Sequence, residues 1–260
     1  MNDTAAALDA LIIDRPRTKA AKPIYMTTGD ANNLPPAAKA WLETNAQAVD
    51  AEFVSLIPGN GPSSTVDCAV LGLGSDANPF AAGRLTKHLL DGTWYFENIP
   101  DHVDADQLML GYLLGSYSFD SYKKSKPRDI KLHPPKEADL GAVLRKAKGV
   151  YAVRNLVNTP ANDMGPDAIE AAARAVARTH KANVKVVSGD DLLSKDFPLI
   201  HAVGRAAAQE PRLVDIKWGR RGAPKLTLVG KGVAYDTGGL NIKPGGSMRN
   251  MKKDMGGAAH

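Results

Sequence analysis

The chain has 260 residues, enough for one or two domains, and its 43% hydrophobic and 23% charged residues are typical of a globular protein. It lacks an apolar run of about 18 residues and a signal-peptide pattern at its start, so we expect a cytoplasmic protein that does not span a membrane. The net charge of +5 is mild, and the single cysteine, Cys68, excludes an internal disulfide and a thiolate metal site.

The first half of the chain alternates strand-like and helix-like segments. Apolar runs bounded by turn residues predict strands at residues 10–16, 52–59, 66–74, 92–100 and 128–135. We expect Cys68 to be buried in one of these strands. Helices are predicted at residues 35–47, 80–91 and 104–124, with Asp104 as the N-cap of the last one. This alternation is typical of an α/β domain.

A helix over residues 138–158 leads from this domain into a second α/β segment. It is followed by the turn-rich sequence NTPANDMGP. Beyond this turn we predict a helix and three strands, at residues 166–180, 183–189, 212–219 and 225–232. The chain therefore divides into an N-terminal domain (1–137), a connecting helix and turn (138–165) and the first part of a second domain (166–260).

Glycine, lysine and aspartate are concentrated in the last segment, VGKGVAYDTGGLNIKPGGSMRNMKKDMGGAAH. Lys231 lies at the carboxyl end of the strand predicted at 225–232, and Asp236 follows in the next loop. Lys243 and Asp254 come later in the same segment. Ligands gather at the carboxyl ends of strands in open α/β sheets, so these charged side chains are candidates for a site.

Three interpretations of this segment are open. A phosphate-binding loop is one, although Gly232 stands where the P-loop pattern needs serine or threonine. A purely structural role, with glycine turns and solvated charges, is the second. A metal site is the third, because two aspartates suit a divalent ion and a nearby cation can remove the proton of a lysine. The spacing alone does not choose among them.

The sequences GKGVAYDTGGLNIKP and MKKDMGGAA resemble the first metal-ligand signature of the leucyl aminopeptidase (cytosol aminopeptidase) family of dinuclear metallopeptidases. Three other segments resemble the family's aromatic helix that closes its N-terminal domain, the turn that opens its catalytic domain, and the stretch before its signature strand. They lie at residues 111–123, 155–166 and 204–218.

The resemblance implies a macro-like N-terminal α/β domain, followed by the first part of a zinc-peptidase-like α/β catalytic domain. It implies that Lys231, Asp236 and Asp254 are ligands of two divalent ions, Mn²⁺ or Zn²⁺, with Asp236 as the bridge. Lys243 would be the catalytic residue that polarises the scissile carbonyl, beside a bound bicarbonate. Met251 would line the substrate pocket.

The resemblance also implies the release of N-terminal amino acids from peptides, with a leucine-type preference, by a homo-hexamer. The family's second signature, N-T-D-A-E-G-R, is absent from the 260 residues. We therefore expect a truncated chain that is inactive alone. The alternative is a DNA-binding or otherwise non-catalytic family member that acts through its basic N-terminal domain. The densest basic segment of that domain, 123–136, has six Lys or Arg and one acidic residue. This segment has no aromatic residue, which favours a solvated loop.

Overall fold

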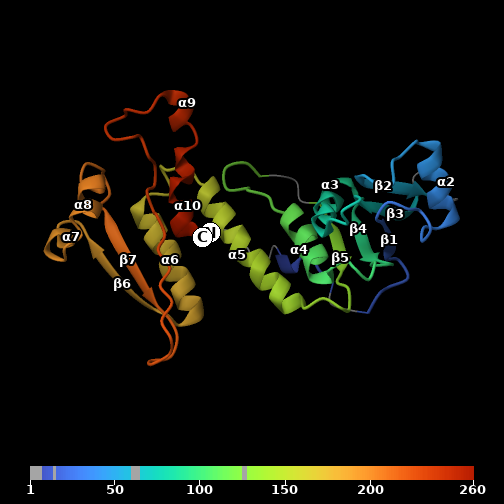
Figure 1. Cartoon of the computed structure of the whole chain (residues 1–260), viewed down its shortest axis with the longest axis horizontal. Coiled ribbons are helices and arrows are strands. Elements are labelled where there is room, and N and C mark those ends of the chain that lie inside the picture. The colour runs from blue at the N-terminus through green and yellow to red at the C-terminus, as the bar shows by residue number, and fades with distance from the viewer. Residues whose placement is uncertain (1–7, 14–15, 60–64, 125–127) are drawn as a thin grey trace. The chain divides into compact units, whose positions relative to one another are not determined.

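The computed structural model describes the chain with three internal gaps, over residues 8–13, 16–59, 65–124 and 128–260. It forms two compact units, Met1–Tyr151 and Ala152–His260, each with its own sheet (Figure 1). The α/β class expected from the sequence is confirmed. The domain limits at residues 137 and 165 stay predictions. No helix of the described residues is long and apolar enough to cross a membrane.

The first unit is built on a five-stranded sheet with the order β2-β3-β1-β4-β5. The strands are β1 (Lys22–Thr27), β2 (Glu52–Pro58), β3 (Val66–Leu73), β4 (Gly92–Phe96) and β5 (Ile130–His133). All are parallel except β2, which runs antiparallel to β3. Six consecutive residues of β3 are buried, as expected of a strand that is covered on both faces.

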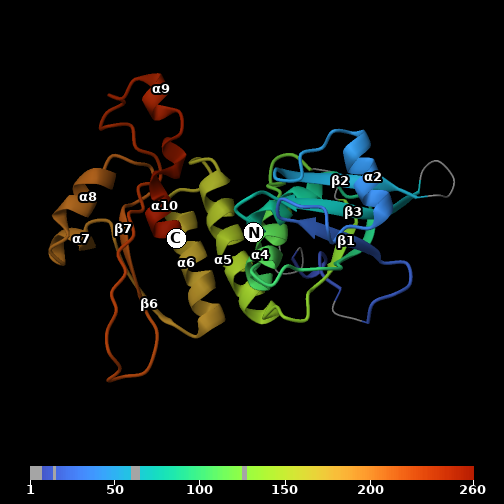
Figure 2. The same ribbon diagram turned by 45° about the vertical axis from the view of Figure 1, so that its right-hand side comes forward.

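Helices cover both faces of this sheet. One face carries α2 (Pro36–Thr44), whose Leu42 packs in a small cluster with Cys68. The other face carries the larger core. Its helical elements are η1 (Pro79–Arg84), α3 (Leu85–His88), α4 (Ala105–Gly115) and the first part of α5 (Leu140–Asn158). In Figures 1 and 2, α2 and α4 lie on opposite sides of the strands. The predicted N-cap is confirmed, because the Asp104 carboxylate accepts a hydrogen bond of 3.0 Å from the backbone N–H of Gln107.

The contact between η1 and α4 is made by main chain against main chain. A Cβ atom on Gly115 would lie 2.5 Å from Gly83 Cα, and one on Gly111 would lie 3.0 Å from the Pro79 carbonyl oxygen. No other residue type fits at Gly111 or Gly115 without moving a backbone. We call these three glycines, Gly83, Gly111 and Gly115, the glycine seam.

The second unit begins with a helix on a two-stranded antiparallel sheet. Helix α6 (Pro166–His180) packs on β6 (Asn183–Ser188) and β7 (Arg212–Lys217). These three elements agree with the prediction. Two short helices join the strands, α7 (Asp191–Ser194) and α8 (Pro198–Gly204). The remaining helical elements lie near the end of the chain: α9 (Gly245–Met248), η2 (Met251–Met255) and α10 (Gly256–Ala259).

The strand predicted at residues 225–232 is wrong. This run has no regular structure, and its side chains Leu226, Leu228 and Val229 are 83%, 86% and 94% exposed. A strand must satisfy its backbone N–H and C=O groups on a neighbour. Among the described residues no strand pairs with this run, so its strand-forming composition does not produce a strand.

Other expectations for the first unit also need correction. In place of a strand at residues 10–16, Ile12 makes only an isolated bridge to Leu132, and residues 14–15 lie outside the described part. Strand β1 was not predicted, although it lies between β3 and β4. The helix predicted over 80–91 is η1 followed by α3, and the one predicted over 104–124 ends at Gly115.

Candidate metal and catalytic site

Two glycine-rich stretches of the last segment lie against each other. The backbone N–H of Ala258 in α10 donates a hydrogen bond of 2.9 Å to the Lys231 carbonyl oxygen. A Cβ atom on Gly230 would lie 2.6 Å from the Gly257 carbonyl oxygen. Glycine at Gly230 therefore lets the two main chains approach closely, which places Lys231 beside the short helical elements η2 and α10.

Lys231 and Asp254 form the first pair of the site. The Nζ atom of Lys231 lies 2.5 Å from Oδ2 of Asp254, in η2. The Asp254 side chain is 19% exposed and that of Lys231 is 58% exposed. The amine thus keeps a route to solvent while the carboxylate is largely enclosed.

Lys243 and Asp236 form the second pair, at 2.8 Å between Nζ and Oδ2. The loop between Asp236 and Lys243 is closed by a hydrogen bond of 2.9 Å, which the backbone N–H of Lys243 donates to the Thr237 carbonyl oxygen. The other Asp236 oxygen accepts from the Gly238 N–H at 2.8 Å. The Lys243 amine also lies 3.4 Å from the Met251 sulfur.

The charges of this cluster hold Asp236 in its ionised form. Hydrogen bonds from Lys243 and from the Gly238 N–H lower the pKa of Asp236, and the charges of Lys243 and Lys231 act in the same direction. The five side chains predicted from the sequence lie in two groups of contacts. Lys231 contacts Asp254, and Lys243 contacts both Asp236 and Met251.

Lys231, Asp236 and Asp254 could bind a divalent ion if the lysine amine were deprotonated. Two carboxylates and an amine are suitable ligands, but Lys231 must release its proton before its nitrogen can bind a metal. No group of three or more His, Cys, Asp or Glu residues that could hold a metal occurs among the described residues. Within the described residues, a metal site at this cluster would therefore have to include Lys231 as well as the two carboxylates.

Two cations of the basic segment 123–136, Arg128 and Lys131, have partners within the chain. Arg128 donates hydrogen bonds to the carbonyl oxygens of Lys87, at 2.7 Å, and Leu89, at 2.6 Å. Lys131 pairs with Asp129 at 3.0 Å. These cations are engaged within the chain, and residues 125–127 lie outside the described part.

The expectation for the cysteine is confirmed. Cys68 is 7% exposed in β3, and burial raises the pKa of its thiol to about 11. Such a thiol is almost entirely protonated at neutral pH, which leaves little reactive thiolate.

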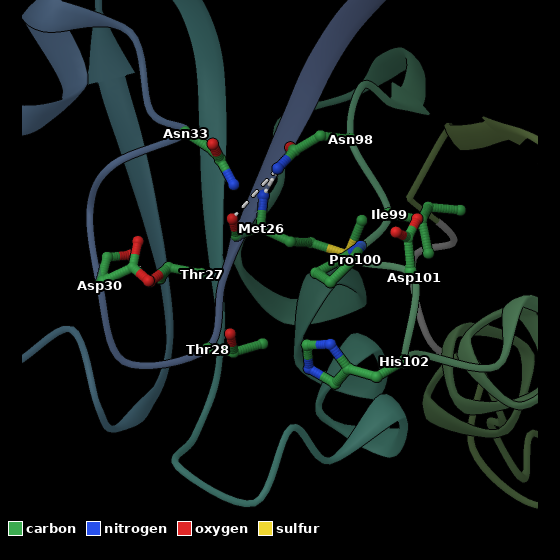
Figure 3. A pocket seen from close by; sticks show the side chains of 10 residues that line it. All are labelled: Met26, Thr27, Thr28, Asp30, Asn33, Asn98, Ile99, Pro100, Asp101 and His102. Carbon is green, nitrogen blue, oxygen red and sulfur yellow. Dashed lines mark hydrogen bonds between the residues drawn. The ribbon is translucent and has the colours of Figure 1, made fainter.

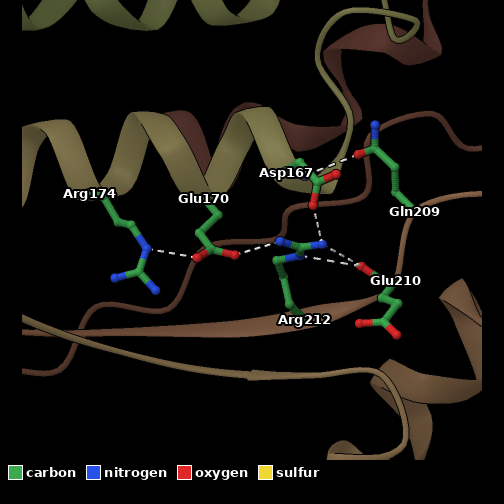
Figure 4. Close-up of polar contacts among 6 residues, drawn as sticks. All are labelled: Asp167, Glu170, Arg174, Gln209, Glu210 and Arg212. Carbon is green, nitrogen blue, oxygen red and sulfur yellow. Dashed lines mark hydrogen bonds and ion pairs between the residues drawn. The ribbon is translucent and has the colours of Figure 1, made fainter.

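A second charged cluster, the Arg212 clamp, was not predicted from the sequence (Figure 4). Arg212 at the start of β7 pairs with two acidic residues of α6, Asp167 and Glu170, with 2.5 Å to Glu170. Glu170 in turn accepts a 2.7 Å bond from Arg174, one turn further along α6. The contact between Glu170 and Arg174 can be predicted from their spacing of four residues in a helix. The contact with Arg212 cannot, because Arg212 lies 42 residues away from Glu170 in the sequence. The clamp fixes α6 to β7.

Comparison with known families covers most of the chain in two pieces. Residues 151–260 match the family model described as "Cytosol aminopeptidase family, catalytic domain". Residues 28–135 match the model "M17 aminopeptidase, N-terminal domain".

Individual relatives agree with these matches. The chain is 39% identical over 170 residues to a probable cytosol aminopeptidase of Geobacter sp. (strain M21), covering 60% of this chain and 34% of that protein. The crystal structure of the Coxiella burnetii cytosol aminopeptidase superposes with a TM-score of 0.86 at 35% identity, over 97% of this chain and 55% of that one. The bottromycin maturation enzyme BotP in complex with Mn gives a TM-score of 0.73 at 26% identity, over 92% and 54% of the two chains. The chain thus spans about a third of the Geobacter relative and about half of each solved chain.

Proposed function

Since the chain belongs to the cytosol aminopeptidase family, we propose that it carries part of the active site of a metal-dependent enzyme that releases N-terminal amino acids from peptides. The observation that carries this proposal is the joint arrangement of the pairs Lys231–Asp254 and Lys243–Asp236 with Met251. The fold supports it, because the solved Coxiella burnetii cytosol aminopeptidase has the same architecture over nearly the whole chain.

Lys231, Asp236 and Asp254 would hold two divalent ions, Mn²⁺ or Zn²⁺, with Asp236 shared between them. The Mn complex of BotP supports a divalent metal in this fold. When bound, such ions polarise a carbonyl group and lower the pKa of water. To bind an ion, Lys231 would have to release its proton, and its half-exposed side chain is in contact with the solvent that would accept it. The enclosed Asp254 carboxylate fixes the position of the amine.

Lys243 would act on the substrate as a protonated amine. The Asp236 carboxylate at 2.8 Å from the Lys243 Nζ fixes the direction of this amine. The ammonium group can then donate a hydrogen bond to the carbonyl oxygen of the scissile peptide, where negative charge develops. The same charge would attract a bicarbonate anion. Met251, in contact with Lys243, supplies a flexible apolar wall for the first side chain of the substrate, which supports a leucine-type preference.

The 260-residue polypeptide alone is proposed to be inactive. The resemblance assigns further ligands and a catalytic arginine to the N-T-D-A-E-G-R motif, which these residues do not contain. In the protein that carries both motifs, we propose assembly as a cytoplasmic homo-hexamer. The name of the Geobacter relative, a probable cytosol aminopeptidase, supports the location.

Metal binding tests this proposal without relying on activity. We expect the 260-residue polypeptide to bind one Mn²⁺ weakly in a calorimetric titration, because it supplies only part of the ligand set. Asp254→Asn should abolish this binding. Asp215→Asn, which changes a half-exposed carboxylate of β7 in the same unit, is the matched control and should bind like the parent. Equal Mn²⁺ binding by the Asp254→Asn variant and the parent would refute the ligand assignment.

A further inference from the structure

A polar pocket of about 400 Å³ lies in the first unit, outside the proposed active site (Figure 3). Two stretches of chain form it. One is the end of β1 and the loop after it, residues 26–33, and the other is the segment that follows β4, residues 98–102. The pocket therefore opens at the carboxyl ends of two neighbouring parallel strands.

The chain changes sides of the sheet at this point. After β1 it leads to α2 on the face with the small cluster, whereas after β4 it leads to α4 on the face with the large core. The two exits diverge and leave a crevice between the ends of the strands. In open α/β sheets, this kind of switch point is where ligands bind.

The walls of the pocket are fixed by internal hydrogen bonds. Asn98 accepts a bond of 3.0 Å from the Met26 N–H and so ties the segment after β4 to β1. Thr27 donates its hydroxyl proton to the Asp30 carbonyl oxygen, and the Asp30 carboxylate accepts from the Asn32 N–H at 2.9 Å. A pocket with such braced walls is pre-formed, which lowers the entropic cost of binding.

Four other lining side chains have no hydrogen-bond partner within the part of the chain that the structure describes: Thr28, Asn33, Asp101 and His102. Figure 3 shows Thr28 and His102 pointing toward each other from the two loops. These groups offer both donors and acceptors to a ligand. Apolar lining comes from Met26, Ile99 and Pro100.

The charge of the lining restricts the ligand. Asp30 and Asp101 supply two carboxylates, and none of the described residues that line the pocket is a Lys or an Arg. A phosphate or carboxylate group would therefore be repelled. Hydroxyl groups are favoured instead, because a carboxylate in an α/β crevice accepts hydrogen bonds from the hydroxyls of a ribose.

We propose that this pocket binds an unphosphorylated nucleoside. The sugar hydroxyls donate to the carboxylate of Asp101, and the base lies on the apolar surface of Ile99 and Pro100. The amide of Asn33 and the imidazole of His102 pair with polar edges of the base. This site uses only residues of the first unit and does not depend on the proposed peptidase activity.

Calorimetric titration of the 260-residue chain with adenosine tests the proposal. A ligand of this size should bind with a Kd of about 0.1 mM. AMP should bind at least about fivefold more weakly, because its phosphate meets the two carboxylates. Asp101→Ala should weaken adenosine binding at least about fivefold. Asp50→Ala, an exposed carboxylate of the same unit that does not line the pocket, should leave it unchanged.

A pocket-filling variant separates loss of binding from loss of folding. Asn33 is exposed, so Asn33→Trp should keep the parent's circular dichroism spectrum and melting temperature while abolishing adenosine binding. Binding of AMP as tightly as adenosine would overturn the proposal. So would parent-like adenosine binding by both Asp101→Ala and Asn33→Trp, or binding of putrescine in the absence of adenosine binding.

Discussion

Replacing Arg212 with methionine should destabilise the second unit by about 3 kcal/mol at pH 7. Methionine keeps most of the volume of the arginine stem and removes the guanidinium group. Glu170 then loses its 2.5 Å partner, Asp167 loses its ion pair, and the Glu210 carbonyl oxygen loses donors at 3.2 and 3.3 Å.

The size of this effect follows from the burial of the partners. Breaking a buried ion pair by removing one member costs about 3–5 kcal/mol. The side chains of Arg212 and Glu170 are 13% and 16% exposed, close to that case. Asp167 is 61% exposed, however, and Glu170 keeps Arg174 at 2.7 Å. Solvent and Arg174 therefore compensate in part, which puts the expected loss at the lower end of the range.

The pH dependence of the effect has a defined sign. Hydrogen bonds from Arg174 and Arg212 lower the pKa of Glu170 below its ordinary value of 4.5. A carboxyl group with a lowered pKa contributes stability that is complete above the ordinary value and is lost as pH falls through the folded value. The difference between the parent and Arg212→Met should therefore shrink below about pH 4.5.

Amide hydrogen exchange, read by mass spectrometry, measures this loss locally. Peptides from α6 and β6 should exchange about 100-fold faster in Arg212→Met, and peptides from β1 and β3 should not change. Arg178→Met removes an exposed arginine from the same helix and serves as the control. Acceleration of less than about threefold would show that the clamp is not a stabilising contact.

Three further predictions concern the site and the cysteine. In the protein that carries both family motifs, Lys243→Ala should lower kcat by about 100-fold and keep its metal, and a variant with unchanged kcat would contradict the role of Lys243. In the same protein, Asp236→Ala should lower both activity and metal content measured by atomic emission, since a shared carboxylate serves two ions; an unchanged metal stoichiometry would exclude the bridge. Cys68 should resist alkylation by iodoacetamide at pH 8 until urea unfolds the chain, because burial raises the pKa of its thiol to about 11. Rapid alkylation of Cys68 in the native protein would contradict this burial.

The proposed inactivity of the 260-residue polypeptide can be tested directly. The purified 260-residue chain should show no turnover of a leucine anilide with added Mn²⁺ and bicarbonate. Turnover within about tenfold of that of the Coxiella burnetii enzyme would mean that the second motif is not needed.

The parts of the fold that local pattern decides could be predicted from the sequence. Strands β2 and β3 and helix α6 have strong apolar periodicity or composition, and all three form. Strand β1 has a proline, Pro23, at its second position. Proline disfavours a central strand, yet β1 lies in the middle of the sheet. Residues 225–232 have the composition of a strand but lack a pairing partner in the part of the chain that the structure describes. Pairing depends on residues distant in sequence, so neither case could be decided locally.

The same limit applies to the site. Lys243 and Asp236 are seven residues apart, and one closed loop brings them together. Lys231 and Asp254 are 23 residues apart and meet because the chain crosses itself at Gly230 and Gly257. The family resemblance named all of these residues, whereas their pairing came only from the structure. The Arg212 clamp and the pocket between β1 and β4 combine residues from separate elements. Of these contacts, only the Glu170–Arg174 pair could be predicted from a single stretch of sequence.

The glycine seam limits how this domain can evolve. When a new side chain collides with another side chain, a second mutation that shrinks the neighbour can restore the fit. At Gly111 and Gly115 the nearest atoms belong to the main chain of η1, which every amino acid shares. No compensating substitution at Pro79 or Gly83 can remove those atoms. Substitutions at Gly111 and Gly115 can therefore be tolerated only if the whole of α4 shifts. A deep mutational scan should find few tolerated substitutions at these positions, even in libraries that randomise η1 at the same time.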